Sequence, residues 1–163
     1  MSSVETTTTI GTAVRDDELE ELLRDVYVGG GFTDAQVAST LFAAAAVRAR
    51  GQVLAARDRD GALAGMIIVV PPESPGRRLA EVHEAELQLL AVRAARRATG
   101  LGRRLVEAAL AELRRLGLRH VVLWTQPTMY AAHRLYERCG FVRAPIRDFE
   151  REARVFWVYE RVT

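Results

Sequence analysis

Two glycines and a group of arginines form the most informative chemical pattern in the sequence. The run Gly100-Leu101-Gly102 follows an apolar stretch that ends at Val92 and precedes a helical pattern. Glycines at a strand-to-helix turn let the backbone approach a ligand closely, and the first amides of a helix have no partner within the helix. A pyrophosphate would bind well here, because these amides and the positive end of the helix dipole attract an anion. Five arginines nearby add positive charge: Arg93, Arg96, Arg97, Arg103 and Arg104. The spacing of the glycines alone is equally compatible with an ordinary loop that carries solvated arginines.

The composition of the 163 residues is that of a globular protein. Hydrophobic residues make up 49% and charged residues 27% of the chain, and no apolar run approaches the length of a membrane span. The N-terminus lacks the basic and apolar regions of a secretory signal, and the single cysteine, Cys139, has no partner for an internal disulfide. We therefore expect a cytoplasmic protein without membrane association. A net charge of +2 argues against a general nucleic-acid surface.

Hydrophobic periodicity predicts the elements that must position the glycine junction. Helices are expected to follow Asp16, Thr33, Leu101 and Thr128, and the apolar face of the second extends to Val47. Strands are expected over residues 10–14, 52–56, 62–70, 81–92, 120–125, 141–146 and 154–160, with a hairpin turn at 58–61 and a charged loop at 147–152. We expect one α+β domain over residues 10–163 after a mobile tail over residues 1–9.

The order of these elements and two motifs resemble the GNAT superfamily of N-acetyltransferases. The family's acetyl-CoA signature (Gln or Arg, two residues, Gly, one residue, Gly or Ala) corresponds to Arg97-Ala98-Thr99-Gly100-Leu101-Gly102. Downstream, Ala132 to Phe141 is similar to the family's alanine, leucine-tyrosine and glycine-phenylalanine pattern. The resemblance covers residues 85–145. It implies the GNAT-like acyl-CoA N-acyltransferase fold, with a mixed central sheet of about seven strands flanked by about four helices.

The resemblance implies acetyl-CoA as co-substrate, in a splayed gap between the strand ending at Val92 and the strand ending at Thr125. The pyrophosphate would bind amides at the glycine turn, the pantetheine arm would pair with the preceding strand, and a bulge there would offer an amide to the thioester carbonyl. The implied binding residues are Leu90, Ala91, Val92, Arg97, Ala98, Thr99, Gly100, Leu101, Gly102 and Arg103. No metal is implied. Met129 stands where the family often has Asn, so it is given no role.

Acetyl transfer to an amine needs a base, because an alkylamine is almost wholly protonated at neutral pH. Glu86 is the candidate base. It precedes Val92 by six residues, so strand alternation is expected to place it on the face that carries Leu90 and Val92. An ion pair between Glu86 and an arginine is the alternative, and a water chain could serve as the base instead. His83, near the start of the strand, is a weaker candidate.

The departing thiolate of CoA needs a proton, and Tyr136 is the candidate acid. The resemblance implies this role, because the aligned tyrosine donates to the CoA sulfur in many relatives. The alternative is an aromatic side chain that only packs in the core. We expect His133 to be exposed or paired rather than catalytic, and Cys139 to be packed.

The implied function is transfer of an acetyl group from acetyl-CoA to a primary amine by direct attack in a ternary complex. The implied acceptor is a small-molecule amine or a protein N-terminus. In relatives its binding site is shaped by loops that correspond to residues 27–32 and 147–152. Asp148, Glu150 and Glu152 would suit a cationic amine, but the sequence favours a solvated loop as their explanation. A catalytically silent acyl-CoA-binding sensor or interaction domain is the alternative function. The sequence leaves open whether the chain forms a homodimer.

Overall fold

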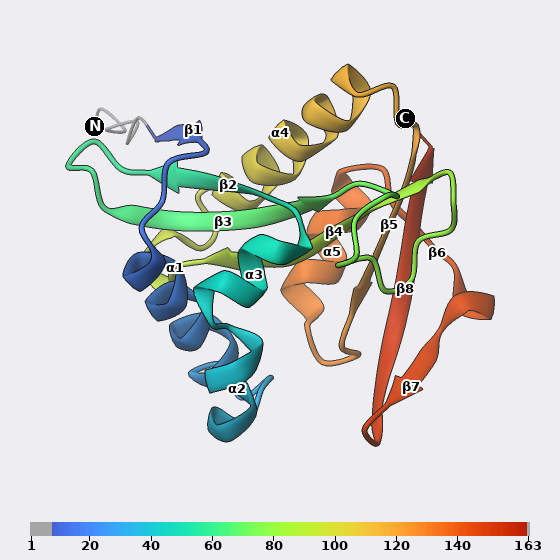
Figure 1. The fold of residues 1–163 in the computed structure, drawn as a ribbon, viewed down its shortest axis with the longest axis horizontal. Coiled ribbons are helices and arrows are strands. Elements are labelled where there is room, and N and C mark those ends of the chain that lie inside the picture. Colours follow the sequence, from blue (N-terminus) through green and yellow to red (C-terminus); the bar gives the residue numbers. More distant parts are fainter. Residues whose placement is uncertain (1–7, 163) are drawn as a thin grey trace.

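The computed structural model describes residues 8–162, in which eight strands form a mixed sheet with helices on both faces (Figure 1). The strand order is β1-β2-β3-β4-β5-β8-β6, and β7 pairs with β8. Only β4 and β5 pair in parallel; the other neighbours are antiparallel. The strands are β1 (Thr9–Gly11), β2 (Gln52–Arg57), β3 (Leu63–Val70), β4 (Glu84–Val92), β5 (His120–Thr125), β6 (Val142–Arg143), β7 (Phe149–Arg151) and β8 (Arg154–Val162).

Three helices cover one face of the sheet, and the long helix α4 lies on the other face with α5 (Figure 1). None of the helices in the described part of the chain is both long and apolar enough to cross a lipid bilayer. The helices are α1 (Asp16–Leu23), which continues as a π-helical turn (Arg24–Val28), α2 (Ala35–Leu41), α3 (Ala44–Arg50), α4 (Leu101–Arg115) and α5 (Tyr130–Arg138).

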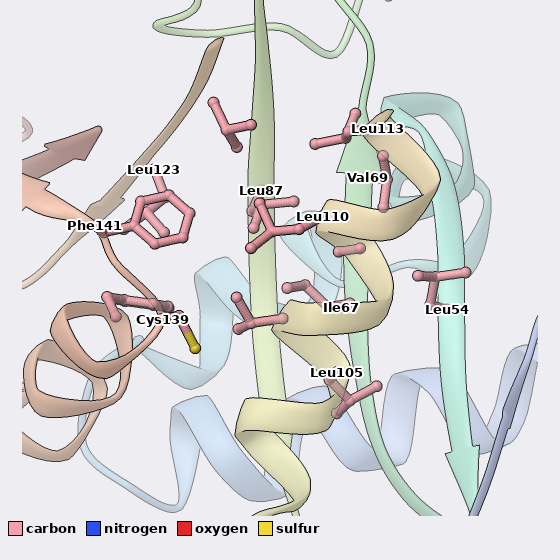
Figure 2. Close-up of a cluster of buried hydrophobic side chains, with 14 of the residues drawn as sticks. Leu54, Ile67, Val69, Leu87, Leu105, Leu110, Leu113, Leu123, Cys139 and Phe141 are labelled. Carbon is pink, nitrogen blue, oxygen red and sulfur yellow. The ribbon is translucent and has the colours of Figure 1, made fainter. Parts of the chain in front are cut away.

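The apolar stripe of α4 fixes its position against the sheet. Leu105 and Leu113 are fully buried and Leu110 is nearly so, at the spacing of one helical face. Figure 2 shows these side chains directed at the strands that carry Leu87 and Ile67. Truncating a buried leucine of this kind to alanine costs about 2–5 kcal/mol, so the packing holds the start of α4 firmly beside the end of β4.

The helix predicted from Thr33 to Val47 is wrong in one respect, because the structure divides it into α2 and α3. The backbone of Ala43 is extended there, which interrupts the helical hydrogen bonds. The free amide of Ala44 donates to the Glu20 carboxylate of α1 at 2.8 Å, so a distant residue caps the second helix. The described residues therefore contain five α-helices rather than the expected four.

The loop predicted at residues 147–152 is also wrong in part, because residues 149–151 form β7. This short strand turns into β8 through Glu152 and Ala153, both with positive φ, and it raises the strand count from seven to eight. The predicted tail lies outside the described residues for positions 1–7. The carbonyl of Thr8, however, accepts a hydrogen bond from Arg104, and Thr9 begins β1, so these two residues belong to the folded part.

Candidate functional site

The strands β4 and β5 separate where the sequence predicts a gap. Their parallel pairing ends at Glu86 and Val122, yet both strands continue beyond that point. A cavity of about 690 Å³ lies there, and both strands line it. Residues 88–90 line it from β4 and residues 124–126 from the end of β5. The predicted gap between the two strands is therefore confirmed, and the free edge of β4 faces a space of ligand size.

A β-bulge distorts β4 beside this cavity. Leu89 and Leu90 together oppose only Ile67 of β3, and Leu89 has a φ of +50°. The carbonyl of Leu90 accepts a hydrogen bond from the Tyr27 hydroxyl at 2.9 Å. Tyr27 comes from the π-helical turn after α1 and lines the same cavity. The bulge that the family resemblance implies is present, and a tyrosine from another element supports it.

The bulge overturns one expectation about Glu86. Before the bulge, Glu86 pairs with Val70 on the face of α1–α3, whereas Leu90 and Val92 pack on the face of α4. One extra residue in the strand shifts the alternation by one position, so residues on either side of it exchange faces. The predicted shared face of Glu86, Leu90 and Val92 is therefore wrong. Whether Glu86 removes a proton stays a prediction.

The contacts of Glu86 are those of a buried anchor. Its Oε1 accepts hydrogen bonds from three successive amides, of Arg78 at 2.8 Å, of Leu79, and of Ala80 at 2.5 Å. Its Oε2 accepts from Gln88 at 2.7 Å, and the side chain is fully buried. Three consecutive amides around one oxygen form an anion nest, which ties the loop before β4 to the strand. Within residues 8–162, Glu86 forms no ion pair with an arginine, which was the alternative.

The glycine junction has the geometry expected of an anion site. Gly100 has a φ of +83°, which favours glycine, and the first hydrogen bond of α4 runs from the Arg104 amide to the Gly100 carbonyl at 3.1 Å. A Cβ at Gly102 would lie 3.0 Å from Leu135 of α5 and 3.7 Å from Val92. Gly102 thus allows α4, α5 and β4 to meet, with the unpartnered amides of α4 at the meeting point.

Most of the arginines near this junction already have protein partners. Arg96 pairs with Asp58 at 2.7 Å and Arg103 with Glu107 at 2.8 Å. Arg93 contacts Asp25 and the Leu63 carbonyl, and Arg104 binds Thr8. Among the described residues, Arg97 has neither an ion pair nor a side-chain hydrogen bond, and it is exposed. A pyrophosphate at this turn would meet backbone amides and Arg97 rather than five free guanidinium groups.

Tyr136 lies on α5 with its ring buried against Phe141 and Tyr159. It also lines the cavity between β4 and β5. Burial raises the pKa of its phenol above the ordinary value near 10, so the hydroxyl keeps its proton at neutral pH. Tyr136 is packed in the core and also lines the cavity, so its packing does not exclude a role as proton donor.

Three neighbours of Tyr136 have structural contacts. The ring of His133 is buried, stacks on Trp157 and bonds the Gln126 carbonyl at 3.0 Å, so it is paired rather than exposed. The thiol of Cys139 is packed, and burial raises its pKa. Met129 precedes α5, and its amide donates to the Gln126 carbonyl at 3.0 Å. The Met129 amide is therefore already engaged within the chain.

The first of the two loops expected to shape the acceptor site contacts the end of β5 and the start of β8. The Phe32 carbonyl accepts hydrogen bonds from Gln126 at 2.8 Å and from Arg154 of β8. Asp148 does not face an acceptor, because it pairs with Arg143 at 2.7 Å, which lowers the pKa of its carboxyl. Glu152 does line the cavity.

Several cavity residues escaped the sequence reasoning, among them Arg50, Arg78 and Gln88, whereas Tyr27 lies in the loop expected to shape the acceptor site. Arg50 lies at the end of α3, just before Gly51. A charged residue before a helix-ending glycine is too common to signal a site without the fold. Its position at the cavity follows from packing of α1–α3 over β4, which single-sequence periodicity does not describe.

Known proteins resemble this chain along most of its length. The model of the acetyltransferase (GNAT) family matches residues 16–141. PaiA N-acetyltransferase from Thermoplasma acidophilum, solved in complex with coenzyme A, has a TM-score of 0.75 and 15% identity over 96% of this chain and 99% of that chain. A Bacillus subtilis acetyltransferase in complex with CoA has a TM-score of 0.66 and 19% identity over 96% of this chain and 97% of that chain.

One curated relative is closer in sequence but over a short segment. Mycothiol acetyltransferase of Geodermatophilus obscurus is 51% identical over 55 residues, which are 34% of this chain and 18% of that protein. The matched segment is thus less than a fifth of the relative's own length. The family model, by contrast, spans more than half of this chain and covers both α4 and α5. The chain therefore belongs to the acetyltransferase (GNAT) family.

Proposed function

We propose that the protein transfers the acetyl group of acetyl-CoA to a primary amine by direct attack in a ternary complex. The observation that carries this proposal is the free edge of β4, which opens into a 690 Å³ cavity at Leu90 and runs on to Val92, where it meets Gly102 and the unpartnered amides at the start of α4. A thioester with a long polar arm and a pyrophosphate needs these two features together. Family membership and the CoA complexes of two structural neighbours support the choice of co-substrate.

The backbone of this chain would hold most of the co-substrate. Residues 97–103 would bind the pyrophosphate through the amides at the turn and the exposed Arg97 side chain. Residues 90–92 would pair with the pantetheine arm along the unpaired edge of β4, as an added strand does. The positive φ of Gly100, which such a turn requires, is already adopted in this structure and supports the assignment.

Tyr136 would donate the proton that the departing thiolate requires. It lines the cavity, and no side-chain hydrogen bond within residues 8–162 occupies its hydroxyl. The raised pKa of the buried phenol keeps the proton available but also limits how strongly transfer is driven. General acid catalysis typically contributes 10²- to 10⁴-fold, and we expect the low end here because a thiolate is a fair leaving group.

Water in the cavity would remove the proton from the amine, rather than Glu86. The Glu86 carboxylate is fully buried, is absent from the cavity lining and accepts four hydrogen bonds. A base must reach the proton directly or through one water molecule, and these contacts argue against that role for Glu86. We therefore assign Glu86 to positioning of the loop before β4.

Mass spectrometry of acetylated products tests the proposed function. The purified chain is incubated with acetyl-CoA and a panel of primary amines, including amino acids, polyamines, aminosugars and peptides with free N-termini. Products 42 Da heavier than an amine, absent with Tyr136→Phe or reduced about tenfold or more, support acetyl transfer through Tyr136. Saturable binding of acetyl-CoA without any product would instead favour a silent acyl-CoA-binding domain.

A further inference from the structure

One part of the cavity wall carries two arginines whose guanidinium groups form no ion pair within residues 8–162. Arg50, at the end of α3, and Arg78, in the loop before β4, line the cavity together with Gln88. Arg50 is only 7% exposed. Burial lowers the pKa of its guanidinium, and the nearby positive charge of Arg78 lowers it further. The two cations are thus near enough to repel each other, although only Arg50 is buried and Arg78 is exposed to solvent.

The Arg50 guanidinium uses little of its bonding capacity. It donates one hydrogen bond, from Nη2 to the Leu41 carbonyl at 3.0 Å. Within residues 8–162, no carboxylate oxygen lies within 4.0 Å of a guanidinium nitrogen of Arg50 or Arg78, whereas arginines elsewhere, such as Arg57 and Arg147, form ion pairs. A buried charge without a counter-charge is costly, and a guanidinium presents a planar fork that binds a carboxylate or phosphate with two parallel hydrogen bonds.

Gln88 adds an unsatisfied acceptor to the same wall. Its Nε2 donates to the Gly76 carbonyl at 3.0 Å and to Glu86 at 2.7 Å, and these two acceptors fix which way the amide points. Its Oε1 is buried and has no hydrogen-bond partner. A buried orphan acceptor costs about 1–3 kcal/mol, so it favours any donor that a ligand or its water brings close.

We propose that the acceptor amine also carries an anionic group, a carboxylate or a phosphate, which Arg50 and Arg78 bind. This inference rests on the proposed acetyl transfer and specifies its substrate class. Gln88 precedes Leu90 by two residues, so the anion subsite adjoins the bulge where the amine would meet the thioester. Amino acids, short peptides and aminoalkyl phosphates combine both groups in one small molecule.

The charge of the whole cavity agrees with an anionic acceptor rather than the cationic one considered from the sequence. Its lining contains four arginines and two acids: Arg50, Arg78, Arg151, Arg154, Asp34 and Glu152. The Asp34 carboxylate is partly engaged, because it caps the Gln36 amide at 2.8 Å. The surplus of positive charge therefore lies where an anionic group would enter.

Matched pairs of amines test the proposal by activity. We would compare kcat/KM for glycine, β-alanine, γ-aminobutyrate and glycylglycine with that for their carboxamides, and for phosphoethanolamine with that for ethanolamine. At least one anionic member should exceed its neutral analogue roughly ten- to hundredfold, the effect of one or two charged hydrogen bonds. The carboxylate and phosphate arms show which anion is preferred.

Variants then assign the preference to the two arginines. Arg78→Gln and Arg50→Met should each reduce the acid-to-amide ratio of kcat/KM to less than about threefold. Arg50→Lys keeps a charge and should restore part of the preference. Arg77→Gln is the matched control, since Arg77 is exposed, lies outside the cavity wall, and its side chain donates within residues 8–162 only to the Pro72 carbonyl. An unchanged ratio in both arginine variants overturns the proposal.

A binding readout separates this inference from the proposed function. In a spectrum of ¹⁵N-arginine-labelled protein with CoA present, the Nε–H signal missing from Arg50→Lys identifies Arg50. γ-Aminobutyrate or phosphoethanolamine should shift this signal, and 4-aminobutanamide should not. A shift without acetylation of any amine would sustain the anion subsite and refute acetyl transfer. Acetylation with equal efficiency for acid and amide, and no shift, would refute the subsite and leave acetyl transfer intact.

Discussion

Substitution of Glu86 by glutamine tests how the loop before β4 is held. The neutral side chain keeps one acceptor oxygen for the amides of residues 78–80. Its new NH₂ group, however, would face the NH₂ group of Gln88, where a 2.7 Å hydrogen bond now exists. The variant therefore loses one charge-assisted hydrogen bond and weakens three others.

The expected cost follows from these contacts. A hydrogen bond to a charged group contributes about 1.5–3 kcal/mol, and the amide bonds to a neutral oxygen retain part of theirs, so Glu86→Gln should lower the free energy of unfolding by about 2–4 kcal/mol. For a chain of this length, that loss corresponds to a fall in Tm of roughly 4–16 °C. Glu81→Gln, an exposed change on the same loop, should stay within about 0.5 kcal/mol of the parent protein.

Urea denaturation and thermal unfolding followed by circular dichroism measure both variants. Activity assayed well below both Tm values adds a second readout, because the pH profile of Glu86→Gln should match that of Glu81→Gln if Glu86 only positions the loop. Equal stability of the two variants would refute the anchoring role. Turnover lost selectively on the acidic side in Glu86→Gln would make Glu86 the base after all.

Three further predictions concern single side chains. Tyr136→Phe should lower turnover about ten- to hundredfold with little change in acetyl-CoA affinity or Tm, as measured by steady-state kinetics and titration; loss of activity only in proportion to stability would leave Tyr136 as a packed aromatic. Gly100→Ala should cost about 1–2 kcal/mol in urea unfolding, because alanine is strained at a φ of +83° although no atom lies within 4 Å of its Cβ; an unchanged midpoint would contradict this. Arg57 lowers the pKa of Glu18 from its ordinary value to about 2, so this pair stabilises the fold above pH 4.5 and the benefit disappears as the pH falls to 2. The stability difference between the parent protein and Glu18→Gln should therefore shrink over that range in urea titrations, and a constant difference would disprove the assignment.

Local patterns predicted the elements of the fold well, because periodicity and glycine signals act over a few residues. The hairpin at 58–61, the end of α4 near Gly117 and the continuous apolar strand β4 all follow from such signals. The separation of α2 from α3 did not, since the Ala44 amide is capped by Glu20 from another helix. A contact between residues distant in the chain leaves no mark in the local pattern.

The sequence likewise predicted some features of the candidate site and missed others. The glycine turn and Tyr136 carry family motifs, so they were predicted from the sequence. The face of Glu86 was mispredicted, because simple alternation holds only while a strand stays regular and the bulge at Leu89 breaks it. Arg50 could be recognised as a cavity residue only from the structure, because α3 brings it to the cavity beside β4.

Calorimetric titration with acetyl-CoA tests the central claim most directly, that the junction of β4 and α4 binds this co-substrate. The parent protein is compared with Gly102→Glu, which places a carboxylate among the amides at the start of α4, and with Ala111→Glu, an exposed change on the same helix. A Cβ at position 102 would lie 3.0 Å from the far end of the Leu135 side chain, which must shift to admit it, so circular dichroism is used to establish that Gly102→Glu is folded. Saturable one-to-one binding by the parent protein and Ala111→Glu, and none by Gly102→Glu, is the expected result. Equal affinity in a folded Gly102→Glu protein would contradict the account.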